Sequence, residues 1–261
     1  MTYDGGNLIF DQSEKNELVS NYPQSNKYII KVLSGSDFLK GTVRYSFWIS
    51  DEELEDAMTI PPIRERIDLV RKFRLKSGSV ARSLSDRPHS FRFPKRANEI
   101  QIVIPRVSAE NRIYYPAGIV AGDTITTDAT YGIYDCGIWI LGIILSKMQM
   151  AWLRTLCGRL GNGYRYSSSI CYNSFPFPDI SETKKQEIEE AVNDVLDVRD
   201  SHVGWTLAEL YDPDKMPEDL RCAHHRLDQV VDSCYRTKPF TNDEERLNCL
   251  FSLYERLINN N

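Results

Sequence analysis

The chain has 261 residues, of which 41% are hydrophobic and 26% are charged. These proportions are typical of a soluble globular protein and exclude a disordered chain, and the length suffices for one large domain or two ordinary ones. The net charge of −5 is unevenly spread, because residues 64–112 carry 13 basic and 5 acidic side chains whereas residues 179–261 carry 10 basic and 19 acidic ones. An acidic total therefore does not exclude a polyanionic partner.

The N-terminus is polar and acidic and lacks the pattern of a signal peptide, and the six cysteines form no C-x-x-C pair. We therefore expect reduced thiols and a cytoplasmic location. The longest uninterrupted apolar run, Ile138–Leu145, is too short to span a bilayer, so we expect no membrane partner.

Short strands alternate with helices in the first part of the chain. The pattern predicts strands at Leu8–Phe10, Lys27–Leu33 and Arg44–Ile49. It also predicts a capped helical turn from Asp11 and a helix over Ile63–Leu75. One face of that helix carries Ile63, Ile67, Val70 and Phe73, and the opposite face carries Arg64, Arg71, Lys72 and Arg74. The basic, hydroxyl-rich segment Lys76–Pro88 follows, and it is either a solvated loop or part of a nucleic-acid footprint.

The middle of the chain predicts closely spaced strands with a polar turn, Arg106–Arg112, among them. The strands are Glu99–Pro105, Ile113–Tyr115, Ala117–Val120, Thr124–Thr127 and Tyr131–Tyr134. Such spacing favours an antiparallel, curled sheet over βαβ units. The segment Ile138–Leu156 is apolar on all sides and predicts one buried central helix.

After Pro178 the pattern changes to amphipathic helices, at Glu182–Asp200, Glu218–Arg236 and Asn242–Asn259. The sequence therefore predicts an α+β fold. Residues 1–178 would form a curled, mostly antiparallel sheet with a central buried helix, and residues 179–261 a small all-α domain.

No catalytic constellation is present in the sequence. There is no glycine-rich phosphate loop after a strand and no N-P-P-[FY] or D-P-P-[FY] tetrapeptide. A nuclease-like motif is formed by Asp179, Glu182 and Lys184, but all three lie at the start of one predicted helix, where the helix dipole favours acidic residues. His224 and His225 are adjacent and so diverge on a helix. We expect neither catalysis nor a bound cofactor or metal in this chain.

The remaining chemistry is that of binding. The stretch Gly158–Pro178 combines arginine, tyrosine and serine with a Gly-Asn-Gly, and its plain alternative is a glycine-rich turn before a proline-rich linker. Arginine can read guanine edges, asparagine can read adenine, and hydroxyls can take phosphates. We expect the basic segment 64–87, the turns near Arg106 and Arg112, and residues 158–169 to form one positive, concave surface.

Several segments, taken in order, resemble one family, the MmeI-like bifunctional type II restriction–modification enzymes. The resemblance covers essentially the whole chain and rests on D-G-G-N-L-I (Asp4–Ile9), S-G-S-D-F-L-K-G-T-V-R-Y-S-F-W-I (Ser34–Ile49), P-x-I-x-x-R (Pro61–Arg66), I-P-R-V-S-A-E-N-R (Ile104–Arg112), L-S-K-M-Q-M-A-W-L-R (Leu145–Arg154), G-R-L…Y-R-Y-S…Y-N-S-F-P-F-P (Gly158–Pro178), L-Y-D-P-D-K-M-P-E-D-L-R (Leu210–Arg221) and K-P-F-T-N-D-E-E-R (Lys238–Arg246).

This resemblance implies that the chain is the target-recognition module and C-terminal helical domain of a longer parent. The parent would be an S-adenosylmethionine-dependent adenine-N6 methyltransferase, with or without endonuclease activity. The chain itself would hold no S-adenosylmethionine. Its partners would be double-stranded DNA and the methyltransferase domain upstream of it in the parent.

The resemblance also implies two groups of base-reading residues, Thr127, Asp128 and Ala129 in one place, and Gly161, Gly163 and Arg165 in another. Family members often have a charged pair where this chain has Gly161 and Gly163. The recognition of the base pair at this position is therefore lost or altered, or it depends on Asn162. Arg165 is the leading candidate for a base contact. Further DNA contacts are expected from Tyr166, Ser167, Arg82, Arg87, Arg106, Ser108 and Arg112. The alternative function is a protein-interaction module that docks on a partner or on the parent's catalytic domain through its acidic helical tail.

Overall fold

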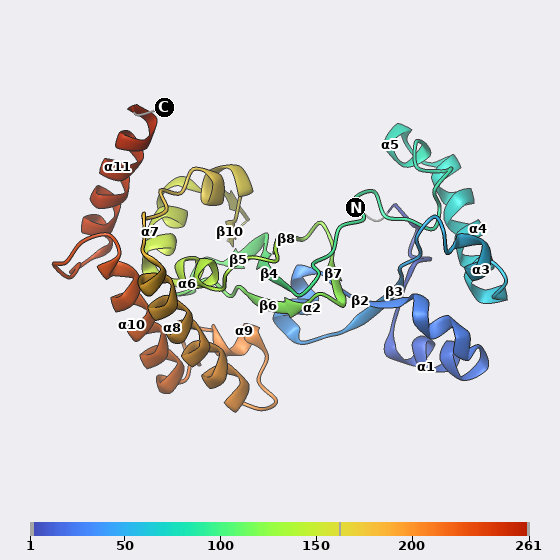
Figure 1. Ribbon diagram of the computed structural model, residues 1–261, viewed down its shortest axis with the longest axis horizontal. Coiled ribbons are helices and arrows are strands. Elements are labelled where there is room, and N and C mark those ends of the chain that lie inside the picture. Colours follow the sequence, from blue (N-terminus) through green and yellow to red (C-terminus); the bar gives the residue numbers. More distant parts are fainter. Residues whose placement is uncertain (1–2, 162, 260–261) are drawn as a thin grey trace.

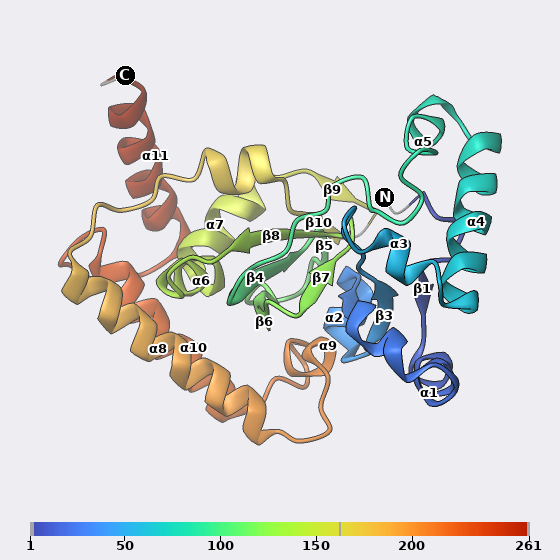
Figure 2. The same ribbon diagram turned by 45° about the vertical axis from the view of Figure 1, so that its right-hand side comes forward.

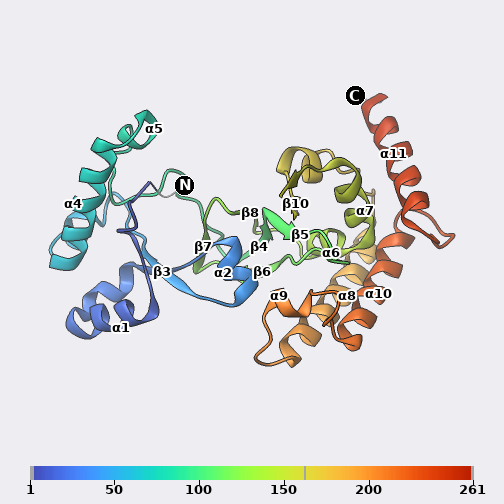
Figure 3. The ribbon, with the colours of Figure 1, turned by 180° about the vertical axis from the view of Figure 1, so that it is seen from behind.

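The computed structural model describes residues 3–161 and 163–259. It is elongated, with helices at both ends and small sheets between them (Figure 1). The first part of the chain contains β1 (Ile9–Phe10), α1 (Gln12–Asn21), the 3₁₀ helix η1 (Pro23–Tyr28), β2 (Ile29–Leu33), α2 (Gly35–Lys40), β3 (Arg44–Phe47), α3 (Leu54–Ala57), α4 (Pro61–Lys76) and α5 (Ser79–Arg82). Seen from behind, α1, α4 and α5 gather at one end (Figure 3).

The rest of the chain supplies the central sheets and the helices at the other end. Its elements are β4 (Ile100–Pro105), β5 (Val107–Ala109), β6 (Gly118–Ala121), β7 (Thr124–Thr126), β8 (Thr130–Tyr134), α6 (Trp139–Leu145), α7 (Lys147–Leu156), β9 (Arg159–Leu160), β10 (Gly163–Arg165), the π-helical η2 (Ser168–Asn173), α8 (Glu182–Ser201), α9 (Leu207–Leu210), α10 (Glu218–Ser233) and α11 (Asp243–Asn259).

The strands form three small open sheets, with the orders β1-β3-β2-β7, β6-β4-β8 and β5-β10-β9. Every pairing recorded among them is antiparallel except β2–β7, where Val32 lies opposite Ile125. This parallel pair joins the two halves of the molecule, because β7 comes from the later half of the chain. The predicted α+β class is confirmed, although the predicted curled sheet is divided into three.

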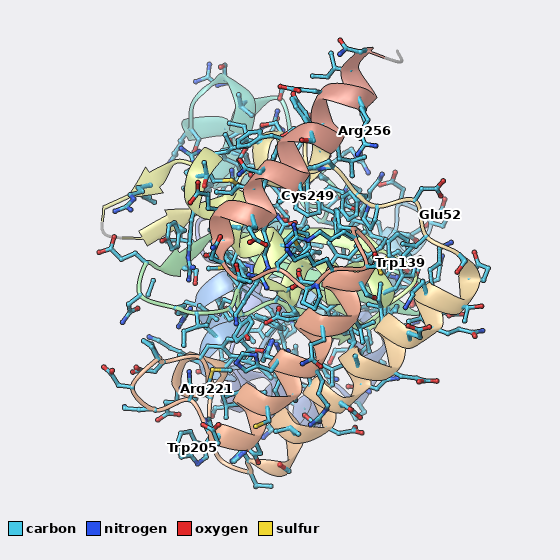
Figure 4. All side chains as sticks on the ribbon, turned by 90° about the vertical axis from the view of Figure 1, so that its left-hand side faces the viewer. Glu52, Trp139, Trp205, Arg221, Cys249 and Arg256 are labelled. Atoms are coloured by element: carbon cyan, nitrogen blue, oxygen red, sulfur yellow. A yellow bond between two sulfur atoms is a disulfide. The ribbon has the colours of Figure 1, made fainter. Side chains whose placement is uncertain are left out.

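Two large hydrophobic cores correspond to the two halves, and a third, small cluster of Ile30, Val32 and Ile125 lies where β2 pairs with β7. The smaller of the two large cores contains Phe10, Tyr28, Phe47, Ile63 and Ile67, from β1, η1, β3 and α4. The larger one extends from Ile102 in β4 to Leu250 in α11 and includes the fully buried Trp152. The tail helices α8, α10 and α11, which cover one end of the molecule in Figure 4, therefore share a core with the central sheet.

Gly142 shows how closely the tail packs on the centre. A Cβ atom at this position of α6 would lie 2.3 Å from the Ile188 side chain and 2.8 Å from Val192, both in α8. Only glycine allows these two helices such a close approach without displacement of the α8 side chains.

Several predicted elements differ locally from the structure. The predicted central helix is two helices, because Ser146 has an extended backbone and its hydroxyl caps α7 by accepting from the Gln149 N–H. Between the two predicted strands Lys27–Leu33 and Arg44–Ile49 lies a short helix, α2, whose capping box consists of Ser34 and Asp37, each of which accepts from the other's backbone N–H. The predicted polar turn 106–112 and the glycine-rich loop 158–163 both contain strands, namely β5, β9 and β10.

Helix α4 buries an arginine that was predicted to lie on its solvent face. Arg74 is fully buried, whereas Phe73, predicted on the apolar face, is 40% exposed. The Arg74 guanidinium donates to the carbonyl oxygens of Tyr3, Leu84, Arg87 and Ser90 over 2.6–2.9 Å. A charged group can be buried here because its donors meet backbone acceptors in the segment that follows the helix.

The cysteines are only partly as expected. The sulfur atoms of Cys157 and Cys171 are in disulfide contact, with their Cα atoms 6.2 Å apart, whereas reduced thiols were expected throughout. This contact brackets the segment that contains β9 and β10. Cys136, Cys222, Cys234 and Cys249 are free.

A buried carboxylate ties α10 to the central helices. Asp228 accepts a hydrogen bond from the Tyr114 hydroxyl and another from the Lys147 backbone N–H, each at 2.8 Å. Burial raises the pKa of Asp228 to about 6, although these hydrogen bonds and the Lys147 charge oppose the rise. The folded protein therefore binds a proton at Asp228 more tightly than the unfolded chain does, because the pKa of an aspartate in an unfolded chain is about 4.

This difference predicts a pH-dependent stability. Because the folded pKa lies above the unfolded one, the contribution of Asp228 is fully present below pH ~4 and is lost as the pH rises through about 6. The expected loss in the free energy of unfolding is about 1–3 kcal/mol. Urea unfolding at several pH values should show this decline in the wild type and a flatter profile in Asp228→Asn. Equal slopes in the two proteins would contradict the assignment.

Candidate nucleic-acid interface

The glycine-rich segment forms the hairpin β9–β10, which extends the pairing of β5. In this sheet Gly163 lies opposite Ala109 and Arg165 opposite Val107. Gly161 forms the turn with φ +58°, a left-handed conformation that glycine adopts without strain. Asn162, the third residue predicted for this turn, lies outside the described residues.

Gly163 is held against the neighbouring strand. A Cβ atom there would lie 2.8 Å from the Ser108 carbonyl oxygen, which belongs to the backbone and cannot yield as a side chain would. The glycine is also buried. A charged side chain at this position, as the family resemblance led us to consider, would require the two strands to move apart.

Arg165 is exposed at the end of β10. Its backbone N–H donates to the Gly158 carbonyl at 2.9 Å, which fixes the strand. Among the described residues, no hydrogen bond or ion pair is recorded for its guanidinium. The side chain is therefore available to an external acceptor pair.

The second predicted group forms the turn between β7 and β8. The Thr127 N–H donates to the Leu33 carbonyl at 2.9 Å, and the Thr127 carbonyl accepts from Thr130. Asp128 and Ala129 are exposed at the tip of this turn, and Thr127 is half-buried. The turn is thus anchored at its base and presents its tip to solvent.

Arg106 holds the two groups together. Its backbone N–H donates to the Ala129 carbonyl at 3.0 Å, and its carbonyl accepts from the Tyr166 N–H at 2.9 Å. Its guanidinium lies 4.8 Å from the Tyr131 ring centroid and donates to the Asp128 carbonyl at 2.8 Å. One residue therefore bonds to the turn on one side and to the residue after Arg165 on the other.

Three residues predicted to contact DNA are buried. Tyr166 is fully buried and packs on Tyr115 at 5.2 Å between ring centroids. Ser108 and Arg112 are 3% and 8% exposed, and the Arg112 guanidinium donates to the Ser108 hydroxyl at 3.1 Å. Burial lowers the pKa of Arg112. Because they are buried, these side chains hold the hairpin in place and are not exposed at its surface.

Ser167 also has an internal role, because its hydroxyl accepts from the Ile170 N–H and caps η2. It remains half-exposed beside Ser169, whose hydroxyl lies 2.9 Å away. Arg82 and Arg87 are exposed in and after α5, where Arg82 donates to the Ser77 carbonyl and Arg87 lies 3.7 Å from Asp51. They belong to the end of the molecule that contains α4, away from β10 (Figure 1).

The structure reveals a further group of residues near the β7–β8 turn. Residues 91–96, which we call the strap, connect α5 to β4 (Figure 2) and have the sequence Phe-Arg-Phe-Pro-Lys-Arg. Phe93 is 73% exposed. The strap was not among the predicted binding segments, although basic residues interleaved with aromatic ones are a usual signal for nucleic-acid binding.

In the part of the chain that the structure describes, no group of three or more His, Cys, Asp or Glu side chains could hold a metal ion. Among the helices of the described residues, none has both the length and the apolar character required to span a membrane.

Comparisons with known proteins give consistent results. The family model described as the MmeI target recognition domain matches residues 1–179, and the model of the MmeI C-terminal domain matches residues 180–260. DNA methyltransferase A of Bacillus subtilis (strain 168) is 41% identical over 258 residues, which are 98% of this chain and 29% of that protein. A solved structure of the type IIL restriction–modification enzyme MmeI in complex with DNA matches with a TM-score of 0.91 and 35% identity. That match covers 98% of this chain and 34% of the other, so the chain spans about a third of the proteins it resembles.

Proposed function

Because the chain belongs to the MmeI family of restriction–modification enzymes, as a target recognition domain followed by a C-terminal domain, we propose that it recognises a specific sequence of duplex DNA for a longer adenine-N6 methyltransferase. The observation that carries this proposal is the position of Arg165. Its guanidinium is exposed, no partner is recorded for it among the described residues, and Arg106 connects its strand to the tip formed by Asp128 and Ala129.

The two neighbouring segments offer complementary chemistry to base edges in a major groove. The Arg165 fork suits the O6 and N7 acceptors of guanine, and the Asp128 carboxylate suits the N4 donor of cytosine. Gly161 lets the turn approach the bases closely, because it has no side chain. Arg82 and Arg87 take phosphates, which positions the duplex without reading its sequence.

The methyl transfer itself belongs to another part of the whole protein. S-adenosylmethionine supplies the methyl group when it is bound there, and the glycines of this chain do not fit it. Gly161 and Gly163 belong to a β-hairpin, whereas a cofactor loop of the usual kind follows a strand and opens a helix. The role of this chain is to hold the duplex while a target adenine is extruded towards the catalytic domain.

The acidic tail supports the recognition fold from within. Its helices share the larger core with β4, α6 and α7, so they are part of the same body as the hairpin. Nothing in this packing favours the alternative of a protein-interaction module that docks on a partner or on the parent's catalytic domain through its acidic helical tail.

A selection experiment tests the proposed function. The full-length protein, incubated with a randomised duplex library at low salt, is expected to enrich one consensus sequence, and methylated adenines in treated DNA should fall within that consensus. Enrichment of unrelated sequences, or methylation outside the consensus, would refute sequence recognition by this chain.

A further inference from the structure

A cavity of about 380 Å³ lies beside the proposed reading turn, and the function proposed above does not use it. Its walls come from both halves of the molecule. The strap contributes Phe91, Arg92, Phe93 and Lys95. Val32 comes from β2, and Trp48 is the residue that follows β3. The β7–β8 region contributes the rest, from Ile125 to Tyr134.

The side chains of this cavity suit a flat ring. Trp48 and Phe91 both line the cavity and stack on each other, with ring centroids 6.3 Å apart and planes inclined by 30°. Tyr131 and Tyr134 line the cavity as well. Aromatic side chains placed in this way bind nucleobases by stacking, whichever base is presented.

The cavity also contains groups that can bind the edge of a ring. The Thr126 hydroxyl oxygen receives a hydrogen bond from the Gln101 side-chain amide at 2.9 Å. This bond occupies one lone pair of the Thr126 oxygen, and the Thr126 O–H can donate to an acceptor in the cavity. Gln101 is fully buried behind this point, and its side-chain oxygen has no partner among the described residues.

The charges around the opening match a phosphate chain. Arg92 and Lys95 line the cavity and are exposed. Arg92 also lies 5.0 Å from the Phe93 ring centroid, and Arg96 lies 6.0 Å from the Trp48 ring centroid. Asp128 is the acidic residue of the lining, and it belongs to the turn already proposed to face the bases.

From these features we infer that the cavity takes one unstacked nucleotide of the bound DNA, with its base between the aromatic walls and its phosphates at Arg92 and Lys95. This inference rests on the proposed function, because it requires DNA to lie at the β7–β8 turn. Most of the Phe93 surface is exposed in the free protein. Its side chain is therefore available either to fill the space that the nucleotide leaves in the duplex or to pack over the base in the cavity.

The test uses the full-length protein and two duplexes of the same sequence, one fully paired and one with a single thymine bulge at its centre. A bulged nucleotide is already unpaired, so part of the unstacking cost is removed. We expect the wild type to bind the bulged duplex about tenfold more tightly, and Phe93→Ala to lose this preference. Phe93→Tyr keeps the ring and should retain it.

Phe251→Ala serves as the matched control, because Phe251 is a partly exposed phenylalanine on α11, far from the strap. Equal binding of the two duplexes by the wild type would overturn the inference and leave the proposed function intact. A bulge preference that survives in Phe93→Ala would also overturn it and would place the preference in the catalytic domain. Failure to bind either duplex would instead contradict the proposed function.

Discussion

Replacing Arg165 with alanine is expected to relax the DNA specificity of the full-length protein at one base pair of its consensus. The exposed guanidinium offers two parallel donors, and a bidentate arginine–guanine contact is worth about 1–3 kcal/mol of discrimination. Competition binding with consensus duplexes, each altered at one position, measures the effect. Discrimination should fall about 5-fold to 150-fold at one position and stay unchanged at the others.

Two further variants identify the type of contact that Arg165 makes. Arg165→Lys keeps the charge but loses the planar fork, so it should recover affinity without recovering discrimination. Arg256→Ala removes an exposed arginine from α11 (Figure 4) and should change neither quantity. If Arg165→Lys behaved as the wild type, Arg165 would be a phosphate contact.

In contrast, a phosphate contact such as the one proposed for Arg82 should, when removed, weaken binding to all sequences and reduce the log–log salt slope by about 0.9.

Replacing Arg74 with methionine is expected to destabilise the end of the molecule formed by α4, α5 and the segment up to Ser90. The guanidinium donates to the carbonyl oxygens of Tyr3, Leu84, Arg87 and Ser90. Its loss would leave buried acceptors unpaired, at a cost of about 3–5 kcal/mol in the free energy of unfolding. Hydrogen exchange of the amides in residues 77–90 and thermal unfolding both report this change.

Arg71→Met provides the control, because Arg71 is exposed on the same helix. Its expected effect is within about 0.5 kcal/mol of the wild type. Arg74→Lys should recover only part of the loss, since one ammonium group cannot reach four carbonyls with the same geometry. Unchanged protection of residues 77–90 in Arg74→Met would show that Arg74 does not hold this segment.

Arg74 also illustrates what could not be predicted from the sequence. Periodicity placed it on the polar face of α4, and it could not reveal that residues 84–90 fold back over that face with their carbonyl groups. The burial of Tyr166 and Arg112, both predicted to contact DNA, could not be foreseen for a similar reason. Their residue types suit DNA contact, but the pairing of β10 with β5, which connects residues far apart in the chain, determines which of them face inward.

Other features were predictable because they are local. The caps at Asp11 and Ser181 follow from residue type and position, and the structure contains both. The amphipathic tail helices follow from the spacing of their apolar residues. Ser146 was missed because an apolar segment on either side concealed the break between α6 and α7. The family was recognised from ordered motifs, and its recognition is confirmed by the matches to both domains.

The contact of Gly142 with α8 has a consequence for the exchange of specificities between related enzymes. A chimera joined near residue 179 would combine α6 from one parent with α8 from another, at a seam where a single methyl group would meet Ile188 and Val192. Recombination at that point therefore requires a glycine in α6 of one parent and side chains in α8 of the other that fit against it. Grafting of the β7–β8 and β9–β10 turns alone avoids this seam, so new specificities should be accessible through these short loops.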